Sequence, residues 1–315
     1  MIIHQLQSKP PPELSRALEK FEKPFRYPLG SEQFFHITHG RDYPRFFRAM
    51  GEANCFVAER DGHIMGVLSA SLRHLTLPSG NTLPVVYFGD LKVDQQARGG
   101  RTLHRLIESV KKWIKSRASC AYSVVMDGTA AIPPRYTGRL GIPFFREMGK
   151  LSILQLAADS THEPSDSSWI SSAEKVQSCY LKLTRGRYAC IDGNPEERSE
   201  IQPVWIMDPD GRACGRLEDT RRAKRLITDE GTEIRSAHLS CFAYQHRMIG
   251  AQLLQVALRV AASRNFPDMF VAIPHSEASS LCDALDGLDP VIAPATVFGT
   301  GLQSGPLWNI NTAEI

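Results

Sequence analysis

Residues 90–107 read DLKVDQQARGGRTLHRLI, and this stretch decides the fold. It links an apolar strand over 85–93 to an amphipathic helix predicted over 102–116, whose apolar residues recur at helical spacing. The loop between them is basic and carries two adjacent glycines. Because amides at a helix N-terminus point outward and the helix dipole favours negative charge, this arrangement predicts an anion site. A solvated basic helix start is the alternative interpretation.

Two pairs of stretches in the chain resemble each other at nearly the same offset. Residues 57–68 align with 206–217, and both predict a strand, an Asp-Gly turn and a second strand. Residues 106–125 align with 253–272, and both predict a helix followed by a strand. The pattern favours an internal duplication. Two unrelated α/β halves are the alternative.

The length of 315 residues and a polar segment rich in Ser, Pro and Asp predict a chain of two domains. We expect an N-terminal domain at 1–158, a linker at 159–172 and a C-terminal domain at 173–315. Within the first, residues 1–30 are expected to form an extension or loosely packed arm because of their three consecutive prolines. The other elements expected there are a strand near 34–37, a helix over 43–50, a hairpin over 55–72, and strands over 122–126 and 151–156.

The composition narrows the class of protein. Hydrophobic residues at 42% and charged residues at 23% describe a soluble globular chain, and the net charge of +3 is too small to indicate a nucleic-acid partner. The seven scattered cysteines indicate buried thiols rather than disulfides or a zinc site. No apolar run is long enough to span a bilayer, and no signal-peptide pattern begins the chain. We therefore expect a cytoplasmic protein without a membrane partner; a homo-oligomer is compatible with the sequence.

The loop and its flanks resemble the GNAT (acetyl-CoA-dependent N-acetyltransferase) superfamily. That family has a Leu-x-Val strand, a loop of form [Arg/Gln]-x-x-Gly-x-[Gly/Ala], and a helix that begins x-x-Leu-Leu. The matching positions are Leu91, Val93, Arg98, Gly99, Leu106 and Ile107. Arg101 and Leu103 stand where the family has its later glycines, so the loop departs from the pattern. The resemblance implies an α/β (α+β) fold of two tandem GNAT-like domains, each a mixed, mostly antiparallel sheet flanked by helices.

The resemblance also implies acetyl-CoA as cosubstrate and no metal. The strand would bind the pantetheine arm, a backbone N–H on it would polarise the thioester carbonyl, and the loop amides would hold the pyrophosphate. The implied cofactor-binding residues are Leu91, Val93, Arg98, Gly99, Gly100, Arg101, Thr102 and Leu103. The second-half loop, residues 245–251, keeps only its last glycine, so the first half is favoured as the cofactor site.

The catalytic residues are less well defined. Asp90 is the candidate base, because it follows Gly89, a typical sign of a strand bulge. Pairing of Asp90 with Lys92 on one strand face is the alternative. Asp127 is a second candidate. Phe145 stands at the family's acid tyrosine position and cannot donate a proton, which leaves Tyr136 as replacement.

The implied activity is transfer of an acetyl group, or another acyl group, from acyl-CoA to an amine of a small molecule or peptide. A non-catalytic CoA or acyl-CoA sensor or scaffold is the alternative, which Phe145 and the altered glycines favour. Two further segments stay open. His36 and His39 could ligate a metal only if both imidazoles faced one side, and residues 131–138 either cover a substrate or simply connect two elements.

Overall fold

One large mixed sheet organises the molecule. The computed structural model describes residues 1–29, 33–129, 131–139, 141–158, 167–191 and 193–315. Its 13-stranded sheet has the main order β1-β4-β5-β6-β7-β15-β8-β14-β13-β11-β10. The bounds are β1 Ile2–Leu6, β4 Glu52–Arg60, β5 His63–Thr76, β6 Thr82–Val93, β7 Cys120–Met126, β8 Arg146–Ala157, β10 Val204–Met207, β11 Ala213–Glu218, β13 Ser236–Tyr244, β14 Asp268–Pro274 and β15 Val291–Thr300.

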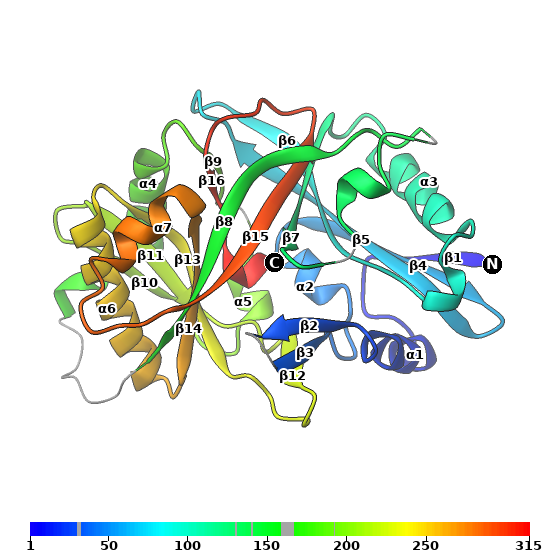
Figure 1. Cartoon of the computed structure of the whole chain (residues 1–315), viewed down its shortest axis with the longest axis horizontal. Coiled ribbons are helices and arrows are strands. Elements are labelled where there is room, and N and C mark those ends of the chain that lie inside the picture. The colour runs from blue at the N-terminus through cyan, green and yellow to red at the C-terminus, as the bar shows by residue number, and fades with distance from the viewer. Residues whose placement is uncertain (30–32, 130, 140, 159–166, 192) are drawn as a thin grey trace.

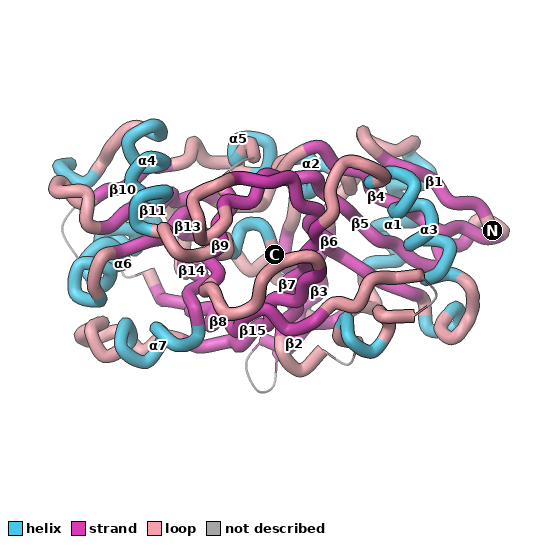
Figure 2. Tube along the Cα trace, turned by 90° about the horizontal axis from the view of Figure 1, so that it is seen from above, coloured by secondary structure: helices cyan, strands magenta, loops and turns pink. Residues whose placement is uncertain are grey.

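Short strands and helices surround this sheet (Figure 2). Two short strands extend it beside β5: β9 Tyr188–Cys190 pairs with β5, and β16 Trp308–Asn309 pairs with β9. A separate three-stranded sheet contains β2 Arg26–Leu29, β3 Gln33–Thr38 and β12 Arg225–Thr228. The helices are α1 Pro12–Glu22, α2 Arg45–Arg48, α3 Thr102–Ile114, α4 Ala173–Leu183, α5 Pro195–Arg198, α6 Arg247–Ser263 and α7 His275–Cys282. The 3-10 turns are η1 Gln95–Ala97, η2 Pro133–Arg135, η3 Ser167–Trp169 and η4 Thr312–Glu314.

The two halves of the chain repeat one order of elements. The first runs β4, β5, β6, α3, β7, and the second runs β10, β11, β13, α6, β14. In each half, the first two strands form an antiparallel pair, and the third strand pairs antiparallel with the second. The helix then connects the third strand to a fourth, which pairs parallel with the third. The Asp61-Gly62 turn has positive φ at both residues, as its dipeptide predicts.

The halves exchange their last strands at the centre of the sheet. β15, from the second half, pairs with β7 of the first, whereas β8, from the first half, pairs with β14 of the second. β8 and β15 also pair with each other and run side by side across the middle of Figure 1. The exchange makes the sheet continuous from one half to the other.

Two local expectations differ from the structure. The loosely packed arm at 1–30 is wrong, since β1 pairs with β4 and Leu18 of α1 is fully buried. The three prolines lead into α1 because proline suits the first helical positions. The helix expected over 43–50 is only α2; a Cβ at Gly51 would lie 2.2 Å from the carbonyl oxygen of Leu72, so the chain leaves the helix tightly against β5.

The segment between the halves lies partly outside the described residues. Of the expected linker, 159–166 is not described, and 167–172 contains η3 and Ser172, whose hydroxyl caps α4 by accepting from the Lys175 amide. The domain boundaries therefore stay a prediction. Six of the seven cysteines are buried and Cys282 is half-buried, which agrees with the buried thiols that the sequence predicted. Within the described ranges, no helix combines the length and apolar character needed to cross a bilayer.

Candidate functional site

A wedge-shaped gap opens between β6 and β7. These parallel strands pair only from Val85 to Tyr87 with Cys120 to Tyr122. Beyond that point β6 stays paired with β5 as far as Val93, and β7 stays paired with β15 as far as Met126. In the described part of the chain no other strand pairs with β6 on this side. The main chain after Tyr87 is therefore available to a ligand that lies in the gap.

A β-bulge shapes β6 at the mouth of the gap. Ser69 pairs with Gly89 and Val67 with Lys92, so Asp90 and its successor face a single residue of β5. Asp90 has φ of 56°, a conformation rare for a residue with a side chain. Gly89 is required by a close approach, since a Cβ there would lie 2.9 Å from the ring of Phe47. The bulge expected from Gly89 is confirmed.

The gap opens into a cavity of about 490 Å³ that passes through the sheet. Its lining includes Tyr87 and Val124, which pack in the hydrophobic cluster on one face. It also includes Phe88 and Val125, which pack in the cluster on the other face. Successive strand residues point to opposite faces, so a cavity lined by both sets reaches both.

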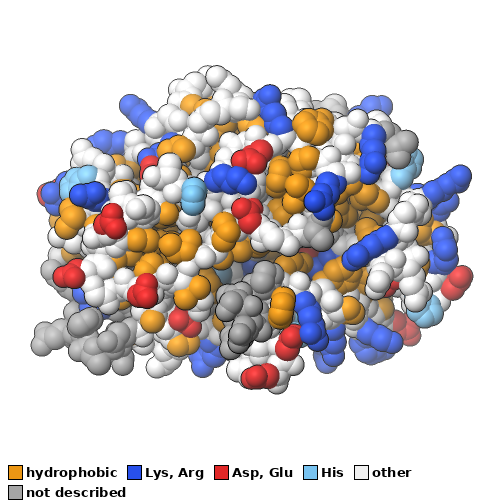
Figure 3. Space-filling view, viewed as in Figure 1, with side chains coloured by type: hydrophobic (Ala, Val, Ile, Leu, Met, Phe, Trp, Pro, Cys, Tyr) orange, Lys and Arg blue, Asp and Glu red, His pale blue; other side chains and the backbone are white. Residues whose placement is uncertain are grey.

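On one face the cavity lies beneath α3. Ile107, Val110 and Ile114 of that helix line it, together with Phe145. Residues of the segment 131–138, including η2, close this part, so the segment covers the cavity rather than only connecting two elements. In Figure 3, hydrophobic side chains come to the surface near the position that β7 has in Figure 1, with Lys and Arg side chains around them.

On the other face the cavity is bounded by the small sheet. Phe35, Ile37 and His39 follow one another at strand spacing and all line it, whereas His36 points away. Leu226 of β12 adds a wall from the second half of the chain. The two histidines therefore do not face one side, which was the condition for a shared metal site.

A buried cluster of charged groups lies at this end of the cavity. His39 Nδ1 is 2.5 Å from Glu22 Oε1, and Lys92 Nζ is 2.5 Å from Asp90 Oδ1. The hydroxyl of Tyr43 donates a hydrogen bond to Asp90 Oδ2. The anticipated pairing of Asp90 with Lys92 is therefore formed, within a larger network.

The protonation states of this cluster follow from burial and charge. Burial opposes ionisation of Asp90, but the attraction of Lys92 and His39 and the donated hydrogen bonds outweigh it, so the pKa of Asp90 lies below its usual value. Burial disfavours the Lys92 ammonium, yet the attraction of Asp90 raises the pKa of Lys92. Burial raises the pKa of the Tyr43 hydroxyl well above its usual value. At neutral pH, Asp90 is ionised and the other two are protonated.

The same cluster has side chains of metal-ligand type. Ligand atoms of Glu22, His39 and Asp90 lie within 4.8 Å of one another. However, Lys92 Nζ lies 3.6 Å from Glu22 Oε1 and still closer to Asp90 Oδ1. The Lys92 ammonium therefore already supplies the positive charge that a metal ion would bring to these two carboxylates. A metal ion would have to displace a buried lysine, and the donor set does not favour one.

The basic loop lies where β6 ends and α3 begins. The Asp94 carboxylate accepts from the amide of Gln96 at 2.8 Å and holds the turn η1, and Gly99 has φ of 76°. The amides of the first turn of α3 have no partner within the helix. Arg98 and Arg101 are exposed beside them. The loop combines helix N-terminal amides, the positive end of a helix dipole and exposed cations, which together suit a phosphate anion.

The corresponding gap in the second half is filled by the chain itself. β13 and β14 pair only as far as His238 and Phe270. Beyond that point, the Cys241 amide donates to Asn311 Oδ1 at 2.8 Å, and Asn309 Nδ2 donates to the Phe242 carbonyl at 3.2 Å. These side chains use main-chain groups that correspond to the open ones of β6. A ligand could bind there only by displacing residues 308–312.

The loop between β13 and α6, which corresponds to the basic loop of the first half, is short and tightly packed. α6 begins at Arg247, three residues after the end of β13 at Tyr244. A Cβ at Gly250 would lie 2.8 Å from the Tyr244 ring, so this glycine permits close packing against the ring. The glycine that aligns with the family loop thus has a packing role here.

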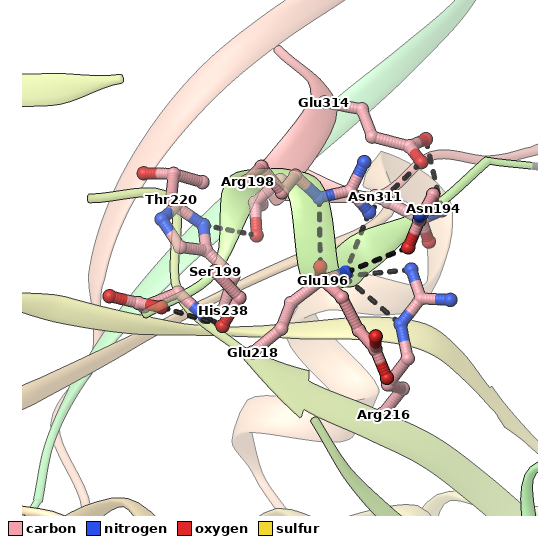
Figure 4. Close-up of polar contacts among 12 residues, drawn as sticks. Asn194, Glu196, Arg198, Ser199, Arg216, Glu218, Thr220, His238, Asn311 and Glu314 are labelled. Atoms are coloured by element: carbon pink, nitrogen blue, oxygen red, sulfur yellow. Dashed lines mark hydrogen bonds and ion pairs between the residues drawn. The ribbon is translucent and has the colours of Figure 1, made fainter. Parts of the chain in front are cut away.

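A buried ionic network anchors the segment that fills the second gap (Figure 4). Arg198 Nε donates to Glu218 Oε2 at 2.8 Å, and Arg216 Nη2 donates to Glu218 Oε1 at 2.7 Å. Arg73 of β5 reaches Glu314 of η4 at 2.9 Å. Burial alone would raise the pKa of Glu218, but the two arginines lower it to about 2. All these side chains are at most 4% exposed, so their charges compensate one another inside the protein.

This anchoring brings further residues to the inner end of the cavity. Thr312, Ile315, Lys224 and His238 all line it. Lys224 Nζ donates to the main-chain oxygen of Ile315, and burial lowers the pKa of Lys224 to about 7. His238 Nδ1 lies 3.0 Å from the Thr312 hydroxyl, and burial lowers the pKa of His238 to about 3, so its imidazole is neutral.

The structure separates the three candidate catalytic residues. Asp90 and Tyr136 line the cavity, and burial raises the pKa of Tyr136 to about 12. Asp127 is not among the lining residues; it accepts from the Thr296 hydroxyl at 2.7 Å and lies 3.8 Å from Lys150. Leu91 lines the cavity, and the other predicted cofactor residues lie on β6, in the loop and on the first turn of α3.

Sequence reasoning missed the Glu22–His39 pair. The alternation of Phe35, Ile37 and His39 was a usable signal, because it places the histidine on the apolar face of a strand. Nothing in the sequence pointed to Glu22, which comes from α1 and reaches His39 only through the tertiary fold.

Solved structures with the same fold include acyltransferases. Saccharomyces cerevisiae N-myristoyltransferase with bound myristoyl-CoA superposes with a TM-score of 0.62 at 10% identity, over 99% of this chain and 87% of that one. A probable N-acyltransferase from Enterococcus faecalis V583 gives 0.52 at 10% identity, over 95% and 72%. A GCN5-related N-acetyltransferase from Anabaena variabilis gives 0.53 at 11% identity, again over 95% and 72%. No family model and no curated protein matches the sequence. At this identity the similarity shows the fold, and the expected fold class of two GNAT-like halves is confirmed.

Proposed function

We propose that this chain, which has the tandem GNAT fold, transfers an acyl group from acyl-CoA to an amine. The observation that carries the proposal is the cavity through the β6–β7 gap. A basic loop suited to a phosphate anion lies at the end of β6, and buried ionisable groups lie at the opposite face. The structural neighbour with bound myristoyl-CoA supports a CoA thioester as donor.

The donor would be held by main-chain groups of the first half. The pyrophosphate would bind the amides of residues 99–103 with Arg98 and Arg101 beside it. The pantetheine arm would follow the unpaired edge of β6. At the bulge, an amide of Asp90 or Leu91 would donate to the thioester oxygen, whose negative charge grows during attack.

The cavity favours an acyl chain longer than acetyl. Its volume of about 490 Å³ lies in the range of pockets that enclose whole small-molecule ligands. Its walls beneath α3 are apolar, with Ile107, Val110, Ile114 and Phe145 among them. An acetyl group would leave most of these walls without a partner, whereas a long chain would cover them.

The acceptor amine would enter from the face of the small sheet. Tyr27, Phe35 and Phe46 line that side, which suits an amine with an apolar body. The ionised carboxylate of Asp90 would attract its ammonium. Direct attack needs no tyrosine acid, because a thiolate leaves readily, so Phe145 is compatible with catalysis.

A chain-length series tests this proposal. We expect the affinity for acyl-CoA to rise about fourfold per methylene from acetyl upward until the cavity is full, since each buried methylene contributes about 0.8 kcal/mol. We also expect release of CoA thiol that requires a primary amine such as 2-phenylethylamine. The measurements are isothermal titration and a thiol-release assay with acetyl-, octanoyl- and myristoyl-CoA. A constant affinity across the series would contradict the long-chain donor.

The second candidate is a non-catalytic acyl-CoA sensor, and Phe145 in place of the family's acid tyrosine favours it. The same assay distinguishes the two functions. Tight binding of acyl-CoA without thiol release, across a panel of primary amines and with hydroxylamine, would support the sensor.

A further inference from the structure

We propose that Glu22 and His39 form the proton-accepting dyad of the acyl transfer, with His39 Nε2 as the general base that deprotonates the acceptor ammonium. This inference rests on the proposed acyltransferase function and adds the general base that deprotonates its acceptor. Glu22 is a positioning residue, since it acts through His39.

Glu22 fixes the imidazole at two points. Its Oε1 lies 2.5 Å from His39 Nδ1, and its Oε2 accepts from the His39 amide at 3.0 Å. Both side chains are at most 2% exposed. A carboxylate accepts the Nδ1 hydrogen, so a neutral imidazole in this position has its lone pair on Nε2.

The ring is held so that this lone pair remains available. Tyr43, Phe46 and Phe47 pack around the imidazole with ring centroids 4.7 to 5.5 Å away. Among the described residues, His39 Nε2 has no hydrogen-bond partner, and His39 lines the cavity. An imidazole fixed in this way beside a substrate-sized cavity is the arrangement that general-base catalysis needs.

The groups that face His39 are less suited to the role. Asp90, 3.8 Å from Nδ1, is ionised and already accepts from Tyr43 and Lys92. Lys92 and Tyr43 keep their protons at neutral pH, because both have raised pKa values. Asp90 also places the oxyanion donors of the bulge next to the dyad, so proton removal and carbonyl activation would occur at one point.

Farther along the cavity, two other ionisable groups are engaged elsewhere. Lys224 Nζ donates to the main-chain oxygen of Ile315. The His238 imidazole is held by the Thr312 hydroxyl, and its pKa of about 3 makes it a weak proton acceptor.

The step balances without any further reactant. The acceptor ammonium gives one proton to His39 Nε2, and the freed nitrogen attacks the thioester carbonyl carbon. A C–N bond forms, the C–S bond breaks, and the thiolate leaves with the electron pair. The second nitrogen proton is lost as the amide forms; one of the two protons neutralises the thiolate, and the other passes to solvent.

The test compares two acceptors with octanoyl-CoA as donor. 2-Phenylethylamine is an ammonium at neutral pH and requires a base, whereas hydroxylamine is unprotonated and does not. We expect His39→Gln to lower the rate with 2-phenylethylamine by about 10² to 10⁴-fold, the usual contribution of a general base. The hydroxylamine rate should change by less than about tenfold on the same principle. Glu22→Gln should show the same split, because an amide donor at this position favours the wrong imidazole tautomer.

His36→Gln is the matched control, since His36 lies on β3 only three residues before His39 and its side chain is outside the cavity lining. It should leave both rates unchanged. Equal losses with both acceptors in His39→Gln would show a structural role and overturn the dyad, as would unchanged rates. No thiol release by the wild-type chain with either acceptor would instead overturn the proposed function, and the dyad's role with it.

Discussion

Val125→Trp is expected to lower the affinity for acyl-CoA by at least about 100-fold, equivalent to roughly 3 kcal/mol of binding free energy. Val125 lies on β7 at the edge of the gap, where it lines the cavity on the α3 face. An indole there would fill the space between β6 and β7 that the donor needs. Isothermal titration with octanoyl-CoA measures the change.

The variant should fold, because the added ring enters existing space instead of a packed core. Val291→Trp is the control: it makes the same substitution on a strand, at a side chain that is 55% exposed and outside the cavity lining. It should bind like the wild type. Unchanged affinity of Val125→Trp, with a normal unfolding temperature, would show that the donor does not pass through the gap.

Glu218→Gln is expected to lower the free energy of unfolding by about 3 to 5 kcal/mol, the usual cost of leaving a buried charge uncompensated. Glu218 is 0% exposed and accepts from both Arg198 and Arg216, so its loss leaves two buried guanidinium groups without their main counter-charge. Urea denaturation followed by far-UV circular dichroism measures the loss.

The control is Glu108→Gln, which removes a carboxylate from the partly exposed pair with Lys111 on α3. Surface pairs contribute little, so no measurable change is expected there. A loss below about 1 kcal/mol in Glu218→Gln would mean that the network does not stabilise the fold as a buried ion pair does.

The features that the sequence predicted are those set by neighbouring residues. Periodicity indicated β6 and α3, Asp61-Gly62 indicated the hairpin turn, and Gly89 indicated the bulge. Each depends on a short-range pattern of side chains or on the backbone freedom of glycine. The pattern of the basic loop is equally local, since it lies within residues 94–103, and its anion-binding role stays a prediction.

The remaining features depend on contacts between distant segments. The exchange of β8 and β15 pairs strands whose patterns would also suit their own halves. The filling of the second gap brings residues 308–312 against β13, although that tail has no readable period. The Glu22–His39 pair joins α1 to the end of β3 in a region that its prolines made look loosely packed. Local propensity does not encode such pairings.

The central claim is that the cofactor binds the first half and not the second. Isothermal titration with CoA tests it most directly on the wild type, Arg98→Glu and Arg247→Glu. The two variants make the same charge reversal in the loop before α3 and at the first residue of α6. We expect one site per chain, weakened at least about tenfold by Arg98→Glu through loss of a charge-assisted contact and unaffected by Arg247→Glu. Two sites per chain, or equal losses in both variants, would contradict the account.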